Sequence, residues 1–251
     1  MISKHESIVY DRWLSQVLNR DVYDLRVDED LIRQAVDDKS VVSKQLDELQ
    51  AGKVFIYSKI LPQVLTAVSF LESRGFNLVD TGIVFEKPVS KESKTTSQIT
   101  IRLAVPEDRD VVVELAGKSF TYSRFHLDRA FRKDEADSLK REWVANYFNG
   151  NRGDAMVVAE ADMKVIGFLL LIFGKDSRLI IDLIAVGEQQ RRKGIAEGMI
   201  IRAESEYSKF STISAGTQLA NTPSLRFYER MGFRISMAKY VFHYHHSAEQ
   251  R

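Results

Sequence analysis

A basic turn at residues 190–196 is the stretch best suited to binding an anion. It reads Gln-Arg-Arg-Lys-Gly-Ile-Ala, follows an apolar run at residues 179–186 and precedes an amphipathic segment at residues 196–207. Backbone N–H groups of such a turn, and the positive end of the helix after it, point at one spot where a pyrophosphate could lie. Gly194 would let a phosphate approach the backbone closely. A solvated basic turn is the alternative, because one glycine is a weak signal.

A second polar segment, residues 221–233, follows further along the chain. Thr222 is expected to cap a helix that has Pro223 at its first position, and Gly232 to end that helix. Tyr228 lies within the helix and carries a phenol that can donate a proton. From the residues alone, Tyr228 is equally a core tyrosine with its hydroxyl at the rim.

The composition excludes several kinds of chemistry. The 251 residues include 36 basic and 35 acidic side chains, a net charge of +1, so no global field favours nucleic acid or an anionic membrane. The absence of cysteine excludes a thiol nucleophile, a zinc–thiolate site and disulfides. No apolar run approaches the ~18 residues that span a bilayer, and the polar N-terminus lacks a secretion signal. We therefore expect a cytoplasmic protein with no nucleic-acid or membrane partner.

The elements that position these segments are expected to form two regions. Residues 90–98 contain no apolar side chain and are predicted to link a small amino-terminal α/β domain, residues 1–89, to a larger domain, residues 99–251. Hydrophobic periodicity predicts helices and strands in both domains. The predicted strands are 22–27, 53–60, 77–87, 100–105, 155–161, 165–173, 179–186, 212–217 and 234–244. The predicted helices are 30–49, one around 65–71, one from 106, one from 134, 196–207 and 223–231.

Together the two motifs resemble the signatures of GNAT-type N-acetyltransferases. Arg191-x-x-Gly194-x-Ala196 after a strand resembles the acyl-CoA-binding signature, and Asn221-x-x-Ser224-x-x-Phe227-Tyr228-x-x-x-Gly232-Phe233 resembles the other hallmark of that superfamily. The resemblance covers about residues 99–244. It implies an α/β (α+β) GNAT fold, a mixed and mostly antiparallel sheet flanked by helices, behind the smaller α/β domain. It also implies acetyl-CoA or another short-chain acyl-CoA as cosubstrate, and no metal.

The resemblance assigns roles to individual residues. Backbone N–H groups of Leu183–Val186 would receive the thioester carbonyl, and Tyr228 would protonate the departing CoA sulfur. Asp182 is the implied catalytic carboxylate, although it is equally a surface strand residue. The implied CoA-binding residues are Leu183, Ile184, Ala185, Val186, Arg191, Arg192, Lys193, Gly194, Ile195, Ala196, Asn221, Ser224 and Tyr228.

A narrower resemblance concerns the acceptor. The amino-terminal unit, the Ser123-Arg124-Phe125 stretch, Trp143 and the Asn221-Thr222 helix start look like dTDP-fucosamine acetyltransferases, which acylate a nucleotide-linked amino-deoxysugar in bacterial surface-glycan (O-antigen) synthesis. This implies direct transfer to a dTDP-linked amino-deoxysugar in a ternary complex. The implied acceptor-binding residues are Ser123, Arg124, Phe125 and His126. A structural histidine and a surface arginine remain alternatives at two of these positions.

Two other functions stay open. One is a GNAT enzyme for another amine (an aminoglycoside, a polyamine or a protein amino group), and the other is a CoA-binding module without catalysis. A homodimer is expected from exposed sheet edges. The C-terminal His243, His245 and His246 have no acidic residue at metal-ligand spacing, and we expect them to form a frayed tail.

Overall fold

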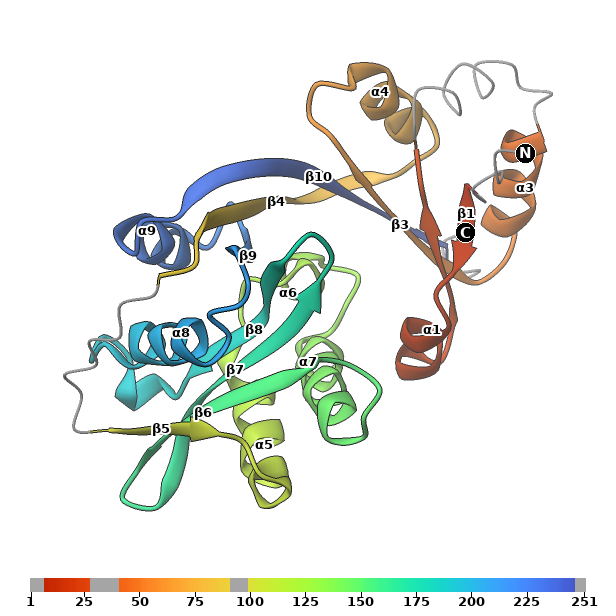
Figure 1. Cartoon of the computed structure of the whole chain (residues 1–251). Helices are drawn as coiled ribbons and strands as arrows, with labels where there is room; N and C mark the ends of the chain where they lie inside the picture. Colours follow the sequence, from red (N-terminus) through yellow and green to blue (C-terminus); the bar gives the residue numbers. More distant parts are fainter. Residues whose placement is uncertain (1–6, 28–40, 91–98, 247–251) are drawn as a thin grey trace. The chain divides into compact units, whose positions relative to one another are not determined.

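Two compact units make up the structure, a computed structural model of the chain (Figure 1). It describes residues 7–27, 41–90 and 99–246. The first unit comprises Met1–Gly82, Leu127–Ala130 and Ala238–Arg251, and the second comprises Ile83–His126 and Phe131–Met237. The predicted domain bounds stay a prediction, because the predicted linker at 90–98 lies, except for Ser90, outside the described residues.

The first unit is a small sheet with helices packed on it. Strand β2 pairs with β1 antiparallel and with β3 parallel, and β3 pairs antiparallel with residues 240–246 of β10. The strands are β1 Ile8–Tyr10, β2 Asp21–Leu25, β3 Val54–Ile60 and β10 Arg234–His246, with β4 Asn77–Pro88 next to β10. The helices are α1 Arg12–Leu18, α3 Val41–Gln50 and α4 Leu65–Ser73. The part of the predicted helix at residues 30–40 lies outside the described residues.

Apolar strand and helix faces build the core of this unit. Six of the seven residues of β3 are buried, as expected for a strand covered on both faces. Its side chains pack with apolar residues of α3 and α4. The buried cluster consists of Leu25, Leu46, Val54, Ile56, Ile60, Ala67, Phe70, Leu71, Phe76 and Phe242.

The second unit contains a mixed sheet in the strand order β4-β9-β8-β7-β6-β5. Strand β5 pairs antiparallel with β6, β6 with β7 and β7 with β8. Strand β8 pairs parallel with β9. The strands are β5 Thr100–Leu103, β6 Ala155–Ala161, β7 Lys164–Gly174, β8 Arg178–Val186 and β9 Thr212–Gln218. The helices are α5 Arg109–Ser119, α6 Arg124–Leu127, α7 Lys133–Phe148, α8 Ile195–Glu206 and α9 Thr222–Arg230. The predicted mixed, mostly antiparallel sheet flanked by helices is confirmed.

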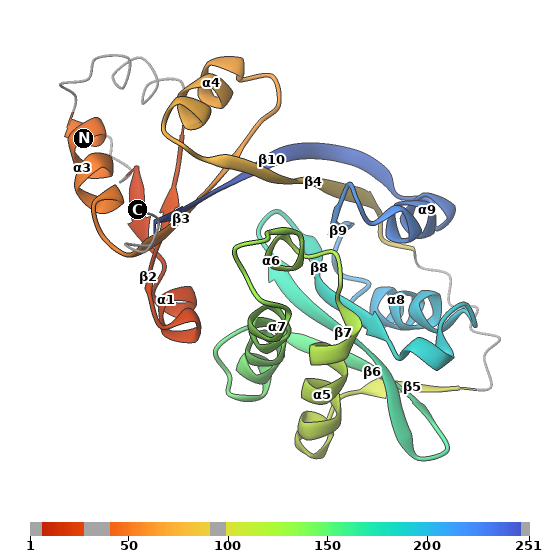
Figure 2. The ribbon, with the colours of Figure 1, turned by 180° about the vertical axis from the view of Figure 1, so that it is seen from behind.

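Helices cover both faces of this sheet. Helices α5 and α7 lie on one face and α8 lies on the other (Figures 1 and 2). Five successive residues of β6, Ala155–Ala159, are buried, which requires cover on both sides. Helix α8 buries Ile195, Met199 and Ala203, which repeat at four-residue spacing and so share one face of the helix. No helix in the described ranges is long and apolar enough to cross a membrane.

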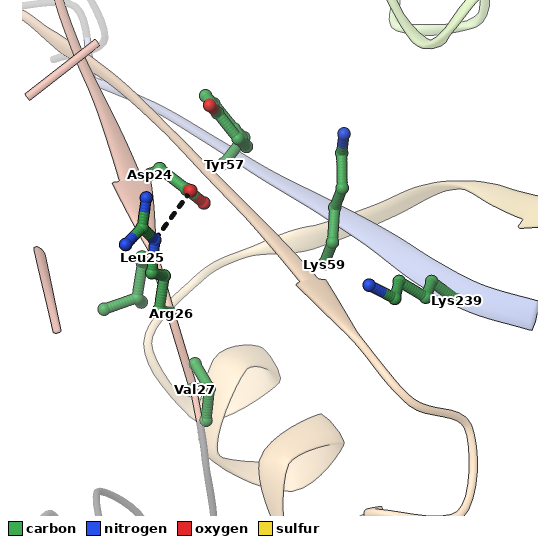
Figure 3. Close-up of a pocket in the computed structure, with 7 residues that line it drawn as sticks. All are labelled: Asp24, Leu25, Arg26, Val27, Tyr57, Lys59 and Lys239. Carbon is green, nitrogen blue, oxygen red and sulfur yellow. Dashed lines mark hydrogen bonds and ion pairs between the residues drawn. The ribbon is translucent and has the colours of Figure 1, made fainter. Parts of the chain in front are cut away.

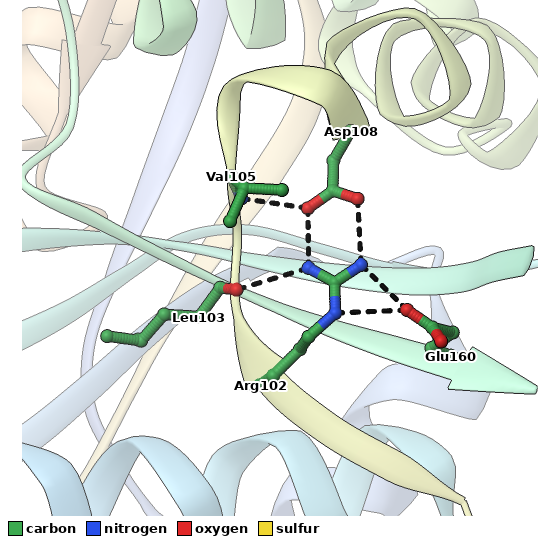
Figure 4. Close-up of polar contacts among 5 residues, drawn as sticks. All are labelled: Arg102, Leu103, Val105, Asp108 and Glu160. Atoms are coloured by element: carbon green, nitrogen blue, oxygen red, sulfur yellow. Dashed lines mark hydrogen bonds and ion pairs between the residues drawn. The ribbon is translucent and has the colours of Figure 1, made fainter. Parts of the chain in front are cut away.

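An ionic cluster fixes the start of α5 (Figure 4). Arg102 of β5 donates two hydrogen bonds to Asp108, at 2.7 and 2.9 Å, and two to Glu160 of β6, at 3.0 and 2.7 Å. Asp108 also accepts the backbone N–H of Val105 at 2.9 Å. The hydrogen bonds from Arg102 lower the pKa of Asp108. The cluster therefore ties two strands and a helix start together and leaves no group free for catalysis.

Strand β8 departs from regular geometry at Asp182. Leu170 of β7 is opposite Leu183, but Leu171 is opposite Ile181, so Asp182 is the extra residue of a β-bulge. The pairing of β8 with β9 covers Arg178–Ile181 and stops at the same place. The end of β8 therefore leaves its backbone unpaired with β9, and a ligand can reach it there.

Candidate active site

A cavity of about 860 Å³ lies in the second unit, beside the end of β8. It is bordered by the last residues of β8 and β9, the loop before α6, the turn before α8 and one side of α9. Twelve of the residues predicted to bind ligands line it. They are Ser123, Ile184, Ala185, Val186, Arg191, Arg192, Gly194, Ile195, Ala196, Asn221, Ser224 and Tyr228.

The predicted anion-binding turn forms one wall of the cavity. Gly194 has φ +76°, and no heavy atom lies within 4 Å of the position that a Cβ would occupy there. Arg191 donates to the carbonyl oxygens of Val186 at 3.2 Å and Ser119 at 3.3 Å. Lys193 donates to Gln190 at 2.7 Å and does not line the cavity. Two of the three basic side chains thus make hydrogen bonds that hold the turn, and its role in binding an anion stays a prediction.

The start of α9 also lines the cavity. Asn221 caps the helix, since its side chain accepts the N–H of Ser224 at 3.3 Å and donates to Thr217 at 3.3 Å. The prediction that Thr222 is the cap is wrong by one residue. Thr222 is already helical, and Asn221 has the non-helical backbone that a cap requires.

Tyr228 lies at the cavity wall but is nearly enclosed. Its side chain is 3% exposed, and its ring packs against those of Phe85, Phe227 and Phe233, with centroids 5.3 to 5.5 Å away. Burial raises the pKa of Tyr228. The phenol is therefore protonated near neutrality and can act only as a proton donor in a first step. That fits the predicted role, which stays a prediction.

Asp182 does not line the cavity. Its carboxylate accepts two hydrogen bonds from Arg152, at 2.8 and 2.6 Å, and one from the indole N–H of Trp143 at 2.8 Å. Asp182, at the bulge, is thus held in an ion pair with Arg152. Leu183, the next residue, lies in the hydrophobic core of the unit rather than at the cavity.

Of the four residues predicted to bind the acceptor, only Ser123 lines the cavity. Its hydroxyl lies 2.6 Å from Nδ1 of His126, whose Nε2 lies 3.0 Å from Asp137. Phe125 is buried against Phe131. The guanidinium of Arg124 lies over the Phe125 ring, 4.4 Å from its centroid.

Several cavity residues were not predicted from the sequence. Arg226 and Arg230 stand one helical turn apart on α9, a spacing that could have indicated a shared face. The others received no ligand-binding role, although four of them lie within the two predicted motifs. They are Ser119, Phe120, Thr121, Tyr122, Gln190, Glu197, Gln218, Thr222, Pro223 and Phe227.

A smaller pocket of about 360 Å³ lies in the first unit (Figure 3). Arg26, Lys59 and Lys239 give it a basic lining, but Arg26 is paired with Asp24 at 3.2 Å. Tyr57 also lines it and donates its hydroxyl proton to Asp11 at 2.9 Å. Such a pocket can attract an anion, but none of the predicted site residues lines it.

The C-terminal histidines are ordered, and the expectation of a frayed tail is wrong. His243 is 1% exposed, and Asp128 lies 2.6 Å from His243 Nδ1 and 2.7 Å from His245 Nε2. Asp128 comes from more than a hundred residues earlier, so local spacing could not reveal it. The ligand atoms of the three side chains lie within 4.8 Å of one another, close enough to hold a metal ion. The expected absence of metal stays a prediction.

A mixed sheet with a bulged central strand, a basic glycine-containing turn after that strand and a cavity reaching both is the arrangement of an acyl-CoA-dependent N-acyltransferase. The comparisons with known proteins agree. The sequence profile of the acetyltransferase (GNAT) family matches residues 119–233. The chain belongs to this family, and acetyl-CoA or another acyl-CoA is the cosubstrate that membership implies.

One relative and two solved structures illustrate the similarity. The chain is 31% identical over 203 residues to the spore coat polysaccharide biosynthesis protein SpsD of Bacillus subtilis (strain 168), covering 80% of this chain and 68% of that protein. A functionally unknown conserved protein from Staphylococcus epidermidis superposes with a TM-score of 0.69 at 14% identity, over 98% and 94% of the two chains. A GCN5-related N-acetyltransferase from Sphaerobacter thermophilus gives 0.62 at 14% identity, over 95% and 75%. These two structures support the fold.

Proposed function

We propose that the protein transfers an acetyl or other short acyl group from acyl-CoA to the amino group of a dTDP-linked amino-deoxysugar, by direct attack in a ternary complex. The observation that carries this proposal is the single cavity that joins the basic turn, the open end of β8 and Tyr228. The product would serve the synthesis of a surface glycan. A cytoplasmic location and a homodimer remain predictions.

The turn supports a position for CoA. Its pyrophosphate would lie at the backbone of Gly194, Ile195 and Ala196, where N–H groups of a helix start favour an anion. Arg192 lines the same wall and adds charge. The pantetheine arm would then extend between the end of β8 and Asn221.

The end of β8 and Tyr228 would supply the chemistry. A backbone N–H of Ile184–Val186 would receive the oxyanion that forms when the amine attacks the thioester. The C–S bond then breaks, and Tyr228 would give its proton to the thiolate. Burial raises the pKa of Tyr228, so the phenol keeps its proton until the thiolate forms. Burial would also raise the pKa of the thiol, which makes the departing thiolate a stronger base for that proton.

The acceptor is supported by the relative rather than by the cavity. SpsD is named for spore coat polysaccharide biosynthesis, and a polysaccharide precursor that carries an amine is the simplest acceptor for an N-acyltransferase in such a process. The cavity also contains Arg226 and Arg230 in addition to the arginines of the turn. Guanidinium groups suit a second diphosphate.

The test is a product survey by mass spectrometry. Purified protein is incubated with several acyl-CoAs, each crossed with dTDP-linked amino-deoxysugars that carry the amine at C3 or C4. We expect one sugar product whose mass rises by one acyl group, with release of free CoA thiol. The matching hydroxysugars, which lack the amine, serve as controls.

Other outcomes would redirect the proposal. Acylation of an aminoglycoside, a polyamine or a peptide, with none of a nucleotide sugar, would leave the N-acyltransferase in place and reject the acceptor. Tight CoA binding without thiol release in the presence of any amine would instead favour a non-catalytic CoA-binding module.

A further inference from the structure

Three side chains of the second unit form a continuous hydrogen-bonded chain that ends at the cavity. The Ser123 hydroxyl lies 2.6 Å from His126 Nδ1, and His126 Nε2 lies 3.0 Å from Asp137 Oδ1. Ser123 precedes α6, His126 belongs to α6, and Asp137 belongs to α7. Only Ser123 lines the cavity. His126 is shielded behind it, with a side chain that is 5% exposed.

The hydrogen bonds determine which atoms carry protons. An ionised carboxylate can only accept, so Asp137 selects the tautomer of His126 with its proton on Nε2. Nδ1 then carries a lone pair, and the Ser123 hydroxyl donates to it. Burial works to raise the pKa of Asp137, but hydrogen bonds from Lys133 and His126 outweigh it, so the pKa is lowered and Asp137 is ionised.

The surroundings keep His126 neutral and able to accept a proton. Burial lowers the pKa of His126. Asp137 opposes this shift, whereas Lys140 and Lys133, also on α7, add to it. An uncharged imidazole with its lone pair directed at a hydroxyl is the arrangement that a general base requires.

We propose that Ser123, His126 and Asp137 form a proton relay that deprotonates the amine of the acceptor. This rests on the proposed function, because it needs an amine in the cavity. An N–H bond of the acceptor ammonium breaks and its proton moves to the Ser123 oxygen, while the Ser123 proton moves to His126 Nδ1. Asp137 stabilises the imidazolium. Ser123 is thus the catalytic residue, and His126 and Asp137 act through it.

The remaining steps balance the protons. The freed amine lone pair forms the C–N bond, the C–S bond breaks, and Tyr228 protonates the thiolate. The nitrogen then loses its second proton to solvent, and Tyr228 regains one proton from solvent. His126 then returns its extra proton to solvent by way of Ser123. The net reaction turns ammonium and thioester into amide, thiol and one released proton.

The experiment compares the pH dependence of kcat/KM for the acceptor in the wild type, His126→Gln, Ser123→Ala and Asp137→Asn. Near pH 7 we expect kcat/KM of each variant to fall about 100-fold, the lower end of the contribution of one general base. The loss should shrink as the pH rises above the pKa of the acceptor amine, since a neutral amine needs no base. Unchanged CoA affinity and thermal unfolding confirm that the variants fold.

Asp134→Asn is the matched control. It is the same substitution on the same helix, at a side chain that is 72% exposed and paired with Arg132, and it should leave the rate unchanged. A loss that is the same at every pH would mean a structural role and overturn the relay. Acyl-CoA is also added without acceptor, and the protein is measured by mass spectrometry. Acylation of Ser123 would overturn the relay in favour of a covalent intermediate. The assay uses whichever amine the wild type acylates, so failure of the sugar proposal is seen separately in the product survey.

Discussion

Two clusters of histidine and carboxylate lie two residues apart in the sequence and in different units. In the second unit, His126 stands between a hydroxyl and a carboxylate, and the hydroxyl reaches a cavity. In the first unit, Asp128 stands between His243 and His245. A histidine between two groups can accept a proton on one ring nitrogen while its other nitrogen donates a hydrogen bond. A carboxylate in the middle can only hold its two neighbours, so the order of the groups separates catalysis from stability.

The largest effect we expect is on stability, from Asp128→Asn. Removing the charge of a buried, hydrogen-bonded carboxylate costs about 3 kcal/mol. An asparagine amide presents one acceptor oxygen in place of two, so it cannot keep the hydrogen bonds from both histidines and from the backbone N–H of Ala130. Urea unfolding followed by fluorescence measures the loss. Asp110→Asn, at an exposed residue paired with Arg109, is the control and should change little. A smaller loss for Asp128→Asn than for the control would remove the distinction between the two clusters.

Tyr228→Phe tests the acid side of the cavity. We expect kcat to fall about 100-fold, the lower end of the effect of one acid–base group, with CoA affinity unchanged because the ring stays packed. Single-turnover kinetics and CoA titration separate the two quantities. Near-wild-type turnover would take Tyr228 out of the mechanism and leave the relay as the one proton-transfer group proposed for the cavity.

Gly194→Ala tests the turn. Its φ of +76° is strained for any residue with a Cβ. Gly232→Ala is the matched control, because Gly232 has φ +82° and also has no heavy atom near its Cβ position, but it does not line the cavity. Each change should cost about 1 kcal/mol of stability. Only Gly194→Ala should also weaken CoA binding, by about 10-fold, as expected for a lost hydrogen bond to a charged group. Equal CoA affinity of the two variants would contradict the phosphate site.

The two clusters should respond to different pH ranges. The pKa of His126 is lowered on folding, so the folded state binds its proton less readily and loses stability as the pH falls through the unfolded value of about 6.5. Asp128 also has a lowered pKa, because hydrogen bonds from His243 and His245 outweigh the effect of burial. Its contribution is complete above about pH 4 and is lost below it. Unfolding measured from pH 7 to 3 in His126→Gln and Asp128→Asn should show the two windows separately.

The smallest effect we expect is that of zinc. Tetrahedral zinc ligands lie roughly 3.3 Å apart, but Asp128 is only 2.6 and 2.7 Å from its two histidines, which is hydrogen-bond geometry. The melting temperature should therefore be the same with equimolar Zn²⁺ and with EDTA. A clear rise with zinc would make this cluster a metal centre.

The sequence predicted the parts of the site that depend on short spacing. The turn at Gly194 and the helix of Tyr228 were found because the residues of each motif are neighbours in the chain. The contacts of Asp182 were not, since they depend on a bulge in β8 and on Arg152, thirty residues away. The partnership of His126 with Asp137 joins two helices whose packing no local pattern shows. Strand β1 and helix α1 were also missed, because they are short and only partly buried.

The way the chain is divided between the two units limits how either unit could be separated or exchanged. The chain passes from one unit to the other after Gly82, His126, Ala130 and Met237. A gene fragment for residues 99–251 would therefore lack β3, the strand that pairs with the end of β10. Recombination at a single junction cannot exchange the first unit for that of a relative.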